Sequence, residues 1–246
     1  MMNDISWLSR TSLLIGEDKV KMLTTKHVMV VGLGGVGSFA AEFICRAGIG
    51  KMTIIDGDVV DPTNRNRQLP ALATNHGVAK AAIMAERLRA INPELELRVI
   101  KQFINPEMVE HLFEEPCDYI IDAIDSITPK LMFIKKAYNT QIPFVSSMGA
   151  GGKLDPTQIQ VVDISKTRNC PFAQQVRKML KKDKIYKGFK AVFSPEENVK
   201  ESLVMTDGSN YKKSAYGTMS YMPATFGAVL SSVAIRAMIE GDEGAG

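Results

Sequence analysis

The stretch that decides the fold runs from residue 27 to residue 37 and reads His27-Val-Met-Val-Val-Gly32-Leu-Gly-Gly-Val-Gly37. Its largely apolar start is typical of a strand buried on both faces of a parallel sheet. The G-x-G-x-x-G pattern follows directly, and residues 38–47 predict a helix that ends at Gly48. Glycines in this setting let the backbone approach phosphates at the positive end of a helix. The segment therefore predicts a strand, a nucleotide-binding loop and a helix.

The alternation of strand and helix continues through the first 150 residues. We expect strands at 52–55, 95–103, 119–121 and 144–146, and helices at 78–91, 106–113 and 127–139. Such alternation is typical of a Rossmann-like, doubly wound α/β fold with a mostly parallel sheet. We assign residues 27–150 to a nucleotide-binding half.

The pattern changes after the glycine-rich segment 149–152. Residues 159–164 alternate between apolar and polar side chains, as an antiparallel strand with one polar face does. Residues 191–222 predict short strands or loops. Because no repeat or long linker separates the halves, we predict a single domain over 1–246. In it, residues 151–246 extend the same sheet by antiparallel strands and bind the acceptor.

Composition places the chain among ordinary globular proteins. It has 246 residues, of which 45% are hydrophobic and 23% charged, with a net charge of +3. These values exclude disordered and collagen-like classes. The N-terminus lacks the basic and apolar regions of a signal peptide. The apolar stretch 224–239 is interrupted by Thr225, Ser231, Ser232 and Arg236, so we expect a packed amphipathic helix and no transmembrane segment.

Cysteine and histidine are few and scattered. Cys45, Cys117 and Cys170 form no CxxC pair and no disulfide framework, which favours a reducing cytoplasmic compartment. The three histidines are equally dispersed. We therefore expect no zinc site.

Polar residues follow the glycine loop at positions suited to a nucleotide. Asp56 ends the second strand, where a carboxylate binds ribose hydroxyls. The loop and these features alone fit an NAD-binding protein equally well. Asn64, Arg67 and Gln68 then occupy the next loop, close to where phosphates would extend.

Arg67, Lys80 and Asp125 together favour a triphosphate bound with a metal ion as the ligand. Arg67 suits bidentate phosphate binding, and Lys80, at the start of the next helix, adds a positive charge. Asp125 lies just beyond the strand that ends near Ile121, at the carboxyl edge of the sheet. A carboxylate facing phosphates requires a cation such as Mg²⁺ between them.

These segments together resemble the ThiF/MoeB/HesA family, the bacterial relatives of ubiquitin-activating enzymes. The matching residues are Arg10, the loop glycines Gly32, Gly34, Gly35 and Gly37, Asp56, Asp58, Asn64, Arg67, Gln68, Lys80, Asp122 and Asp125. The resemblance implies attack of a carboxylate on the α-phosphate of ATP, which gives an acyl-adenylate and pyrophosphate.

The resemblance also implies a role for each residue. Asp56 would hold the ribose, Arg67 and Lys80 the phosphates, and Asp125 the Mg²⁺, while Asn64 helps to place the phosphates. Arg10 would reach the nucleotide of the neighbouring subunit, which implies a homodimer.

One branch of the family fits best. Many members that activate ubiquitin-like or sulfur-carrier proteins hold zinc with two CxxC pairs, and this chain has neither pair. The run from Ser147 to Asp163, and Thr225-Phe-Gly227 near the end, are similar to the branch of tRNA threonylcarbamoyladenosine dehydratases. Members of this branch use ATP to activate the threonylcarbamoyl carboxylate on an anticodon-loop adenosine. Ring closure then expels AMP.

A basic tract agrees with a tRNA partner. Between Lys166 and Lys190 there are nine Lys or Arg residues and one acid, Asp183. Charge of that density attracts phosphate backbones, although such runs are often only solvated helix faces.

Cys170 is the cysteine to weigh as a nucleophile or as a sulfur acceptor for a cysteine desulfurase. Nearby Arg168 and Arg177 would favour its thiolate. Ring closure, however, needs no enzyme nucleophile. Cys45 and Cys117 are expected to be structural.

Three alternatives remain open. The first is an adenylyltransferase for the C-terminal Gly of a ubiquitin-like or sulfur-carrier protein. The second is an NAD-binding module that uses only the glycine loop and Asp56. The third is a non-catalytic scaffold for sulfur relay. Stimulation of ATP–pyrophosphate exchange by modified tRNA, and not by a Gly-Gly-ended protein, would favour the dehydratase.

Overall fold

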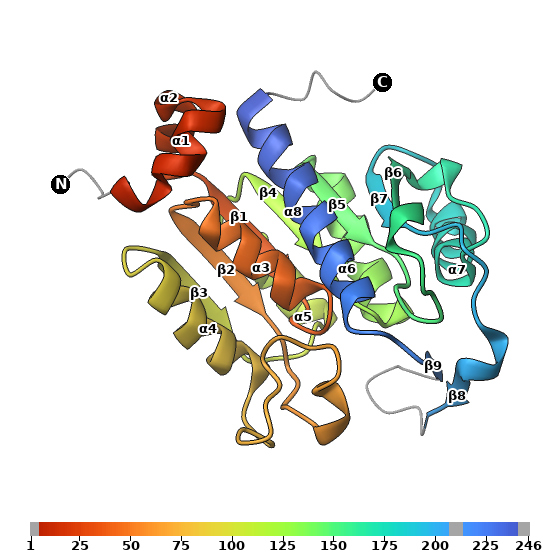
Figure 1. Ribbon diagram of the computed structural model, residues 1–246. Helices are drawn as coiled ribbons and strands as arrows, with labels where there is room; N and C mark the ends of the chain where they lie inside the picture. The colour runs from red at the N-terminus through yellow and green to blue at the C-terminus, as the bar shows by residue number, and fades with distance from the viewer. Residues whose placement is uncertain (1–4, 207–213, 241–246) are drawn as a thin grey trace.

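A computed structural model describes residues 5–206 and 214–240. A seven-stranded sheet in the order β3-β2-β1-β4-β5-β7-β6 forms its centre (Figure 1). The strands are β1 His27–Val31, β2 Lys51–Ile55, β3 Glu96–Ile100, β4 Tyr119–Asp122, β5 Phe144–Ser147, β6 Gln160–Asp163 and β7 Lys190–Phe193. A second, two-stranded antiparallel sheet pairs β8 Leu203–Met205 with β9 Ser214–Tyr216.

Helices cover both faces of the large sheet. They are α1 Ser9–Ile15, α2 Glu17–Leu23, α3 Gly37–Arg46, α4 Lys80–Ile91, α5 Pro106–Leu112, α6 Ile127–Thr140, α7 Pro171–Leu180 and α8 Tyr221–Glu240. The helices α3, α4 and α8 lie in front of the sheet in Figure 1, and α5, α6 and α7 lie behind it.

The two faces of β1 explain this double layer. Its five residues are all buried, and successive side chains point to opposite faces. Val28 and Val30 join the core beneath α3, α4 and α8, whereas Met29 and Val31 join the core beneath α5, α6 and α7. A strand buried on both faces is what the apolar run beginning at His27 predicted.

The predicted α/β class is confirmed, with one difference in the added strands. Strand β6 is antiparallel to β7, as its alternation predicted, but β7 itself pairs in parallel with β5. Residues Ala191-Val-Phe193 are all buried, which is the pattern of an inner strand. The expectation for residues 191–222 also covers 207–213, which lie outside the described residues.

The structure differs locally from the sequence pattern in one helix boundary and in two added helices. Helix α4 begins at Lys80 rather than at residue 78, because Val78 O accepts a hydrogen bond from Val60 N–H and Ala79 forms a bridge with Val59. The sequence pattern also missed α1 and α2. These two short helices lie near the amino ends of the strands, where Leu8 packs against Gly48.

Helix α8 is longer and more apolar than expected. It spans 20 residues with a mean hydropathy of 1.5 in its most apolar part, so its length and composition alone would allow it to cross a membrane. Half of that part is buried inside the protein, and Phe226, Leu230 and Ala234 pack in the core shared with α3. The expected packing against the core is therefore found, in a helix that begins three residues before the apolar stretch 224–239.

Candidate functional site

The glycine loop joins β1 to α3 at the carboxyl edge of the sheet. Gly32 has a φ of +87°, and its N–H donates to Ile55 O at 2.8 Å. A Cβ at Gly37 would lie 1.7 Å from Gly32 O, so the loop closes only with glycine there. A Cβ at Gly34 would meet only Gln68 Nε2, at 3.8 Å. The loop therefore leaves open space at Gly34, beside the first turn of α3.

Asp56 lies directly beside this loop, as predicted. Its carboxylate accepts hydrogen bonds from Leu33 N–H at 2.6 Å and Asp58 N–H at 2.7 Å. Burial raises the pKa of Asp56, while Lys80 and the two N–H donors oppose that rise. A partly buried carboxylate held by two backbone N–H groups is well placed to accept hydrogen bonds from ribose hydroxyl groups.

Lys80 brings a positive charge to the same edge. Its side chain is buried, and its Nζ lies 3.1 Å from Asp58 Oδ2. The backbone reinforces the contact, because Lys80 N–H donates to Asp58 O at 3.0 Å. Asp58 and Lys80 are thus brought together although 22 positions separate them.

The segment after β2 presents Asn64 and Arg67. Asn64 is buried, and its Oδ1 accepts from Asp61 N–H at 3.1 Å, so this oxygen stabilises the turn Pro62–Asn64. Its amide group keeps donor capacity for a phosphate. The Arg67 guanidinium donates to Thr63 O at 2.9 Å and to Asn66 Oδ1 at 2.8 Å.

Arg67 and Asp125 come from different loops, and the charge of Asp125 acts on Arg67. Burial lowers the pKa of Arg67, and the carboxylates of Asp125 and Asp61 oppose that change. Gln68 Oε1 is buried and has no hydrogen-bond partner among the described residues. Buried acceptors usually have a hydrogen-bond partner. A buried acceptor without a partner, beside the open space at Gly34, therefore indicates a site for a ligand that donates a hydrogen bond.

Asp122 is drawn into the interior instead. Its Oδ2 lies 2.7 Å from Lys130 Nζ, and both side chains are fully buried. Ser146 Oγ and Ile124 N–H also donate to this carboxylate. Burial lowers the pKa of Lys130, and Asp122 and Asp125 oppose that change. The ion pair between Asp122 and Lys130 therefore holds α6 against β4. The sequence pattern did not indicate this role for Lys130.

Arg10 lies far from these residues in the fold. It sits on α1, at the top of Figure 1, whereas the loops that follow β2 lie at the bottom. The structure brings together Asp56, Asp58, Asn64, Arg67, Gln68, Lys80, Asp125 and the loop glycines, but not Arg10.

The C-terminal half borders the site with residues that no motif signalled. A Cβ at Gly35 would lie 3.1 Å from Pro223 Cβ, and Asn66 Nδ2 donates to Thr218 O at 3.0 Å. The connection from β9 to α8 thus lies over the glycine loop and the Arg67 segment. These are contacts between distant parts of the chain, so local sequence patterns could not find them.

Cys170 is buried at the start of α7. Arg177, which we expected near its thiol, donates a hydrogen bond to Thr167 Oγ1. Burial lowers the pKa of Lys153, and Cys170 and Glu196 oppose that change. Burial raises the pKa values of Cys45 and Cys117 to about 12, so both thiols are un-ionised near neutral pH.

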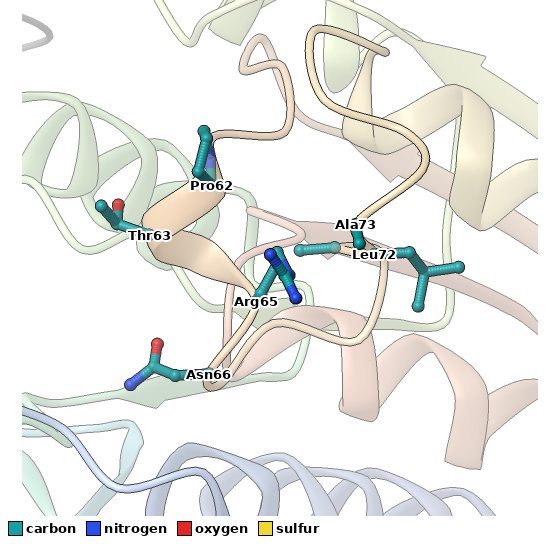
Figure 2. A pocket seen from close by; sticks show the side chains of 7 residues that line it. Pro62, Thr63, Arg65, Asn66, Leu72 and Ala73 are labelled. Carbon is teal, nitrogen blue, oxygen red and sulfur yellow. The ribbon is translucent and has the colours of Figure 1, made fainter.

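An open hollow of about 550 Å³ lies beside the Arg67 segment. In the view of Figure 2, Arg65 lies between the turn with Pro62 and Thr63 and the segment with Leu72 and Ala73. The glycine loop, Asp56 and Lys80 do not line this hollow. The nucleotide site is therefore defined by the loop and its polar neighbours and not by the hollow.

Side chains that could together ligate a metal ion are not clustered in the described ranges. Within residues 5–206 and 214–240, no group of three or more His, Cys, Asp or Glu side chains is arranged to hold a metal ion.

The fold and the loop define a doubly wound nucleotide-binding α/β protein. The model of the ThiF family matches residues 8–245, and the chain belongs to this family. The family resemblance predicted from the sequence is thereby confirmed.

Two similar proteins share one name, tRNA threonylcarbamoyladenosine dehydratase. The Escherichia coli protein is 40% identical over 95% of both chains. The Bacillus subtilis protein is 44% identical over 78% of this chain and 75% of its own. The E. coli enzyme, TcdA, has a crystal structure in complex with ATP that matches with a TM-score of 0.88 and 40% identity, over 98% of this chain and 97% of that chain.

Proposed function

We propose that this protein is an ATP-dependent tRNA threonylcarbamoyladenosine dehydratase. The observation that carries the proposal is the meeting of Asp56, Lys80, Arg67 and Asp125 around the glycine loop. The names of its relatives, and the ATP bound to the similar E. coli structure, support the substrates. The adenylyltransferase for a carrier protein is the less supported alternative, because these relatives share the dehydratase name.

The reaction has two steps. The threonylcarbamoyl carboxylate attacks the α-phosphorus of ATP, the bond to pyrophosphate breaks, and an acyl-adenylate forms. A nucleophilic atom of the same threonylcarbamoyl group then attacks the activated carbonyl. This attack closes the ring, and AMP leaves. Water is removed in net terms, because one carboxylate oxygen departs with AMP and one proton is released.

Each residue has a task in this scheme. Asp56 accepts hydrogen bonds from the ribose, while Lys80, Asn64 and Arg67 bind the phosphates. Arg67 is suited to the growing negative charge as pyrophosphate leaves. Gln68 and Asp58 complete the surroundings of the nucleotide.

Asp125 is the residue that would hold Mg²⁺. One or two carboxylates together with substrate phosphates form the usual setting for this ion. The metal would neutralise phosphate charge, and Asp125 would fix its position. We propose no zinc.

The wider assignments follow from this function. We propose a homodimer in which Arg10 serves the partner's site, and a cytoplasmic location, where tRNA is found. A cysteine desulfurase partner with Cys170 as sulfur acceptor is a weaker proposal, because Cys170 is buried.

The test is AMP release from ATP by the purified protein. We expect AMP with tRNA that carries threonylcarbamoyladenosine, together with a nucleoside lighter by one water in mass analysis. Unmodified tRNA and a Gly-Gly-ended carrier protein are the controls. AMP release with the carrier protein alone would instead support the adenylyltransferase.

A further inference from the structure

The basic tract places exposed positive side chains before, on and after α7. Ala173, Val176 and Leu180 are buried against the core, so the opposite face of α7 points to solvent. We define the basic surface as the exposed side chains of Arg168, Lys178, Lys181, Lys182, Lys184 and Lys187.

The other three basic residues of the tract, of which Lys166 is exposed, are half-buried or interact with neighbouring groups of the protein. Arg177 donates to Thr167 Oγ1, and Lys190 is half-buried in β7. Lys166 lies near the carboxylate of Asp163. We therefore leave these three residues out of the basic surface.

The single acid of the tract does not neutralise this surface. Asp183 Oδ2 lies 2.5 Å from Lys135 Nζ on α6, so its charge is already balanced. Of the six positive side chains, one lies on α7, one precedes it and four follow it. Together they match a chain of phosphates, each of which carries one negative charge.

The amino end of α7 lies beside the site, whereas the lysines of the basic surface lie on the last turn of this helix and in the segment after it. Phe172, in the first turn of α7, has its ring 5.7 Å from Lys130 Nζ, and a Cβ at Gly149 would lie 3.4 Å from Phe172 Cβ. Lys130 bonds to Ile124 O, and Gly149 follows β5. The amino end of α7 thus lies at the carboxyl ends of β4 and β5, close to the loop that carries Asp125.

We infer that the basic surface binds the phosphate backbone of the tRNA substrate and directs the acceptor nucleoside toward the Asp125 edge of the site. This inference rests on the proposed function for the identity of the RNA. A polyanion that lies along α7 approaches the site at Phe172. The recognition is of backbone charge, so it is strongly dependent on salt and independent of base sequence.

The experiment compares two double variants with equal change in charge. Lys178→Glu with Lys182→Glu alters one face of the basic surface. Arg89→Glu with Lys101→Glu alters exposed residues elsewhere. Binding of fluorescein-labelled tRNA is measured by anisotropy over a range of salt concentrations, and ATP binding by calorimetry shows that each variant is folded.

We expect the first variant to lose roughly two units from the slope of log affinity against log salt, because each phosphate contact contributes about 0.9. Its ATP affinity and the control's tRNA affinity stay within about twofold of wild type. Equal losses in both variants, or no tRNA binding by wild type, would overturn the inference. So would a first variant that loses binding to phosphatidylserine vesicles while it keeps wild-type tRNA affinity.

The two proposals fail separately. The docking inference is decided by tRNA binding alone, whereas the proposed dehydratase activity is decided by AMP release from wild-type protein.

Discussion

At the scale of single residues, adjacent glycines of one loop have different tasks. Gly37 is required by the backbone, because a Cβ there would overlap Gly32 O at 1.7 Å. Gly34 faces open space, where a methyl group would meet only Gln68 Nε2 at 3.8 Å. The first residue serves folding, and the second keeps room for a ligand.

Alanine at each position separates these tasks. Gly37→Ala should lower the free energy of unfolding by roughly 3 kcal/mol, because the loop must shift to relieve the overlap. Gly34→Ala should leave stability unchanged but weaken ATP binding by on the order of tenfold, since the methyl group occupies space beside the ligand. Urea unfolding and calorimetry give the two quantities. Equal losses of stability in both variants would contradict this assignment.

At the scale of elements, buried contacts fix helices on the sheet. Lys130 of α6 and Asp122 of β4 form a fully buried ion pair with a separation of 2.7 Å. Such a pair contributes little net stability compared with apolar side chains, but removal of one partner leaves an uncompensated charge. The pair therefore orients α6, and with it the loop that carries Asp125.

Lys130→Met should lower the free energy of unfolding by about 3–5 kcal/mol. Adding Asp122→Asn should recover part of that loss, because an amide can still bond to Ser146 and Ile124 N–H. The control is Lys135→Met on the same helix, whose half-exposed pair with Asp183 should be worth less than about 1 kcal/mol. Additive effects in the double variant would show that Asp122 and Lys130 do not act as a pair.

Helix α8 meets the glycine loop through Gly227. A Cβ there would lie 2.6 Å from Val36 O and 2.9 Å from Phe39 Cβ. Helix propensity favours alanine over glycine by about 1 kcal/mol, but the overlap with a backbone oxygen outweighs that gain.

We expect Gly227→Ala to lower the free energy of unfolding by roughly 1–2 kcal/mol and to weaken ATP binding, because it displaces the end of the loop. Ala228→Gly, one position along α8, should cost about 1 kcal/mol through propensity alone and leave ATP affinity unchanged. A rise in the melting temperature of Gly227→Ala would contradict this prediction, because it would show that α8 can move away from α3 without loss of stability.

At the scale of the whole molecule, the two ends of the sheet separate Arg10 from the nucleotide site. Helices α1 and α2 lie near the amino ends of the strands, and Asp56, Lys80 and Asp125 lie at the carboxyl ends. Within one subunit, Arg10 therefore cannot touch the nucleotide. If it acts in catalysis, it acts in a second subunit.

Mixing two inactive variants tests this arrangement. Arg10→Ala and Arg67→Ala should each lose dehydratase activity as homodimers. After denaturation and refolding together, half of the dimers are mixed and each carries one complete site, so activity should recover to roughly a quarter of wild type. No recovery, although mixed dimers form, would place Arg10 outside the partner's site. If the Arg10→Ala variant alone keeps its activity, Arg10 is not a catalytic residue.

The local patterns of the sequence determined the α/β class, the glycine loop and most strands, because periodicity and glycine spacing act over a few neighbouring residues. They also placed Asp56, Lys80 and Arg67 at strand ends or in the loops that follow, since parallel strands share a carboxyl edge. Their meeting around the loop could be expected for that reason.

Only the tertiary structure decided which side chains face the ligand and which face the interior. Asp122 and Asp125 belong to one short motif, yet the first forms a buried ion pair with Lys130, whereas the charge of the second acts on Arg67. Local sequence patterns also did not indicate that β7 runs parallel to β5. Nor did they indicate that Arg10 lies on α1, at the opposite end of the strands from the site. The physical reason is that these features depend on contacts between distant segments, whose burial and hydrogen bonding exist only once the chain has folded.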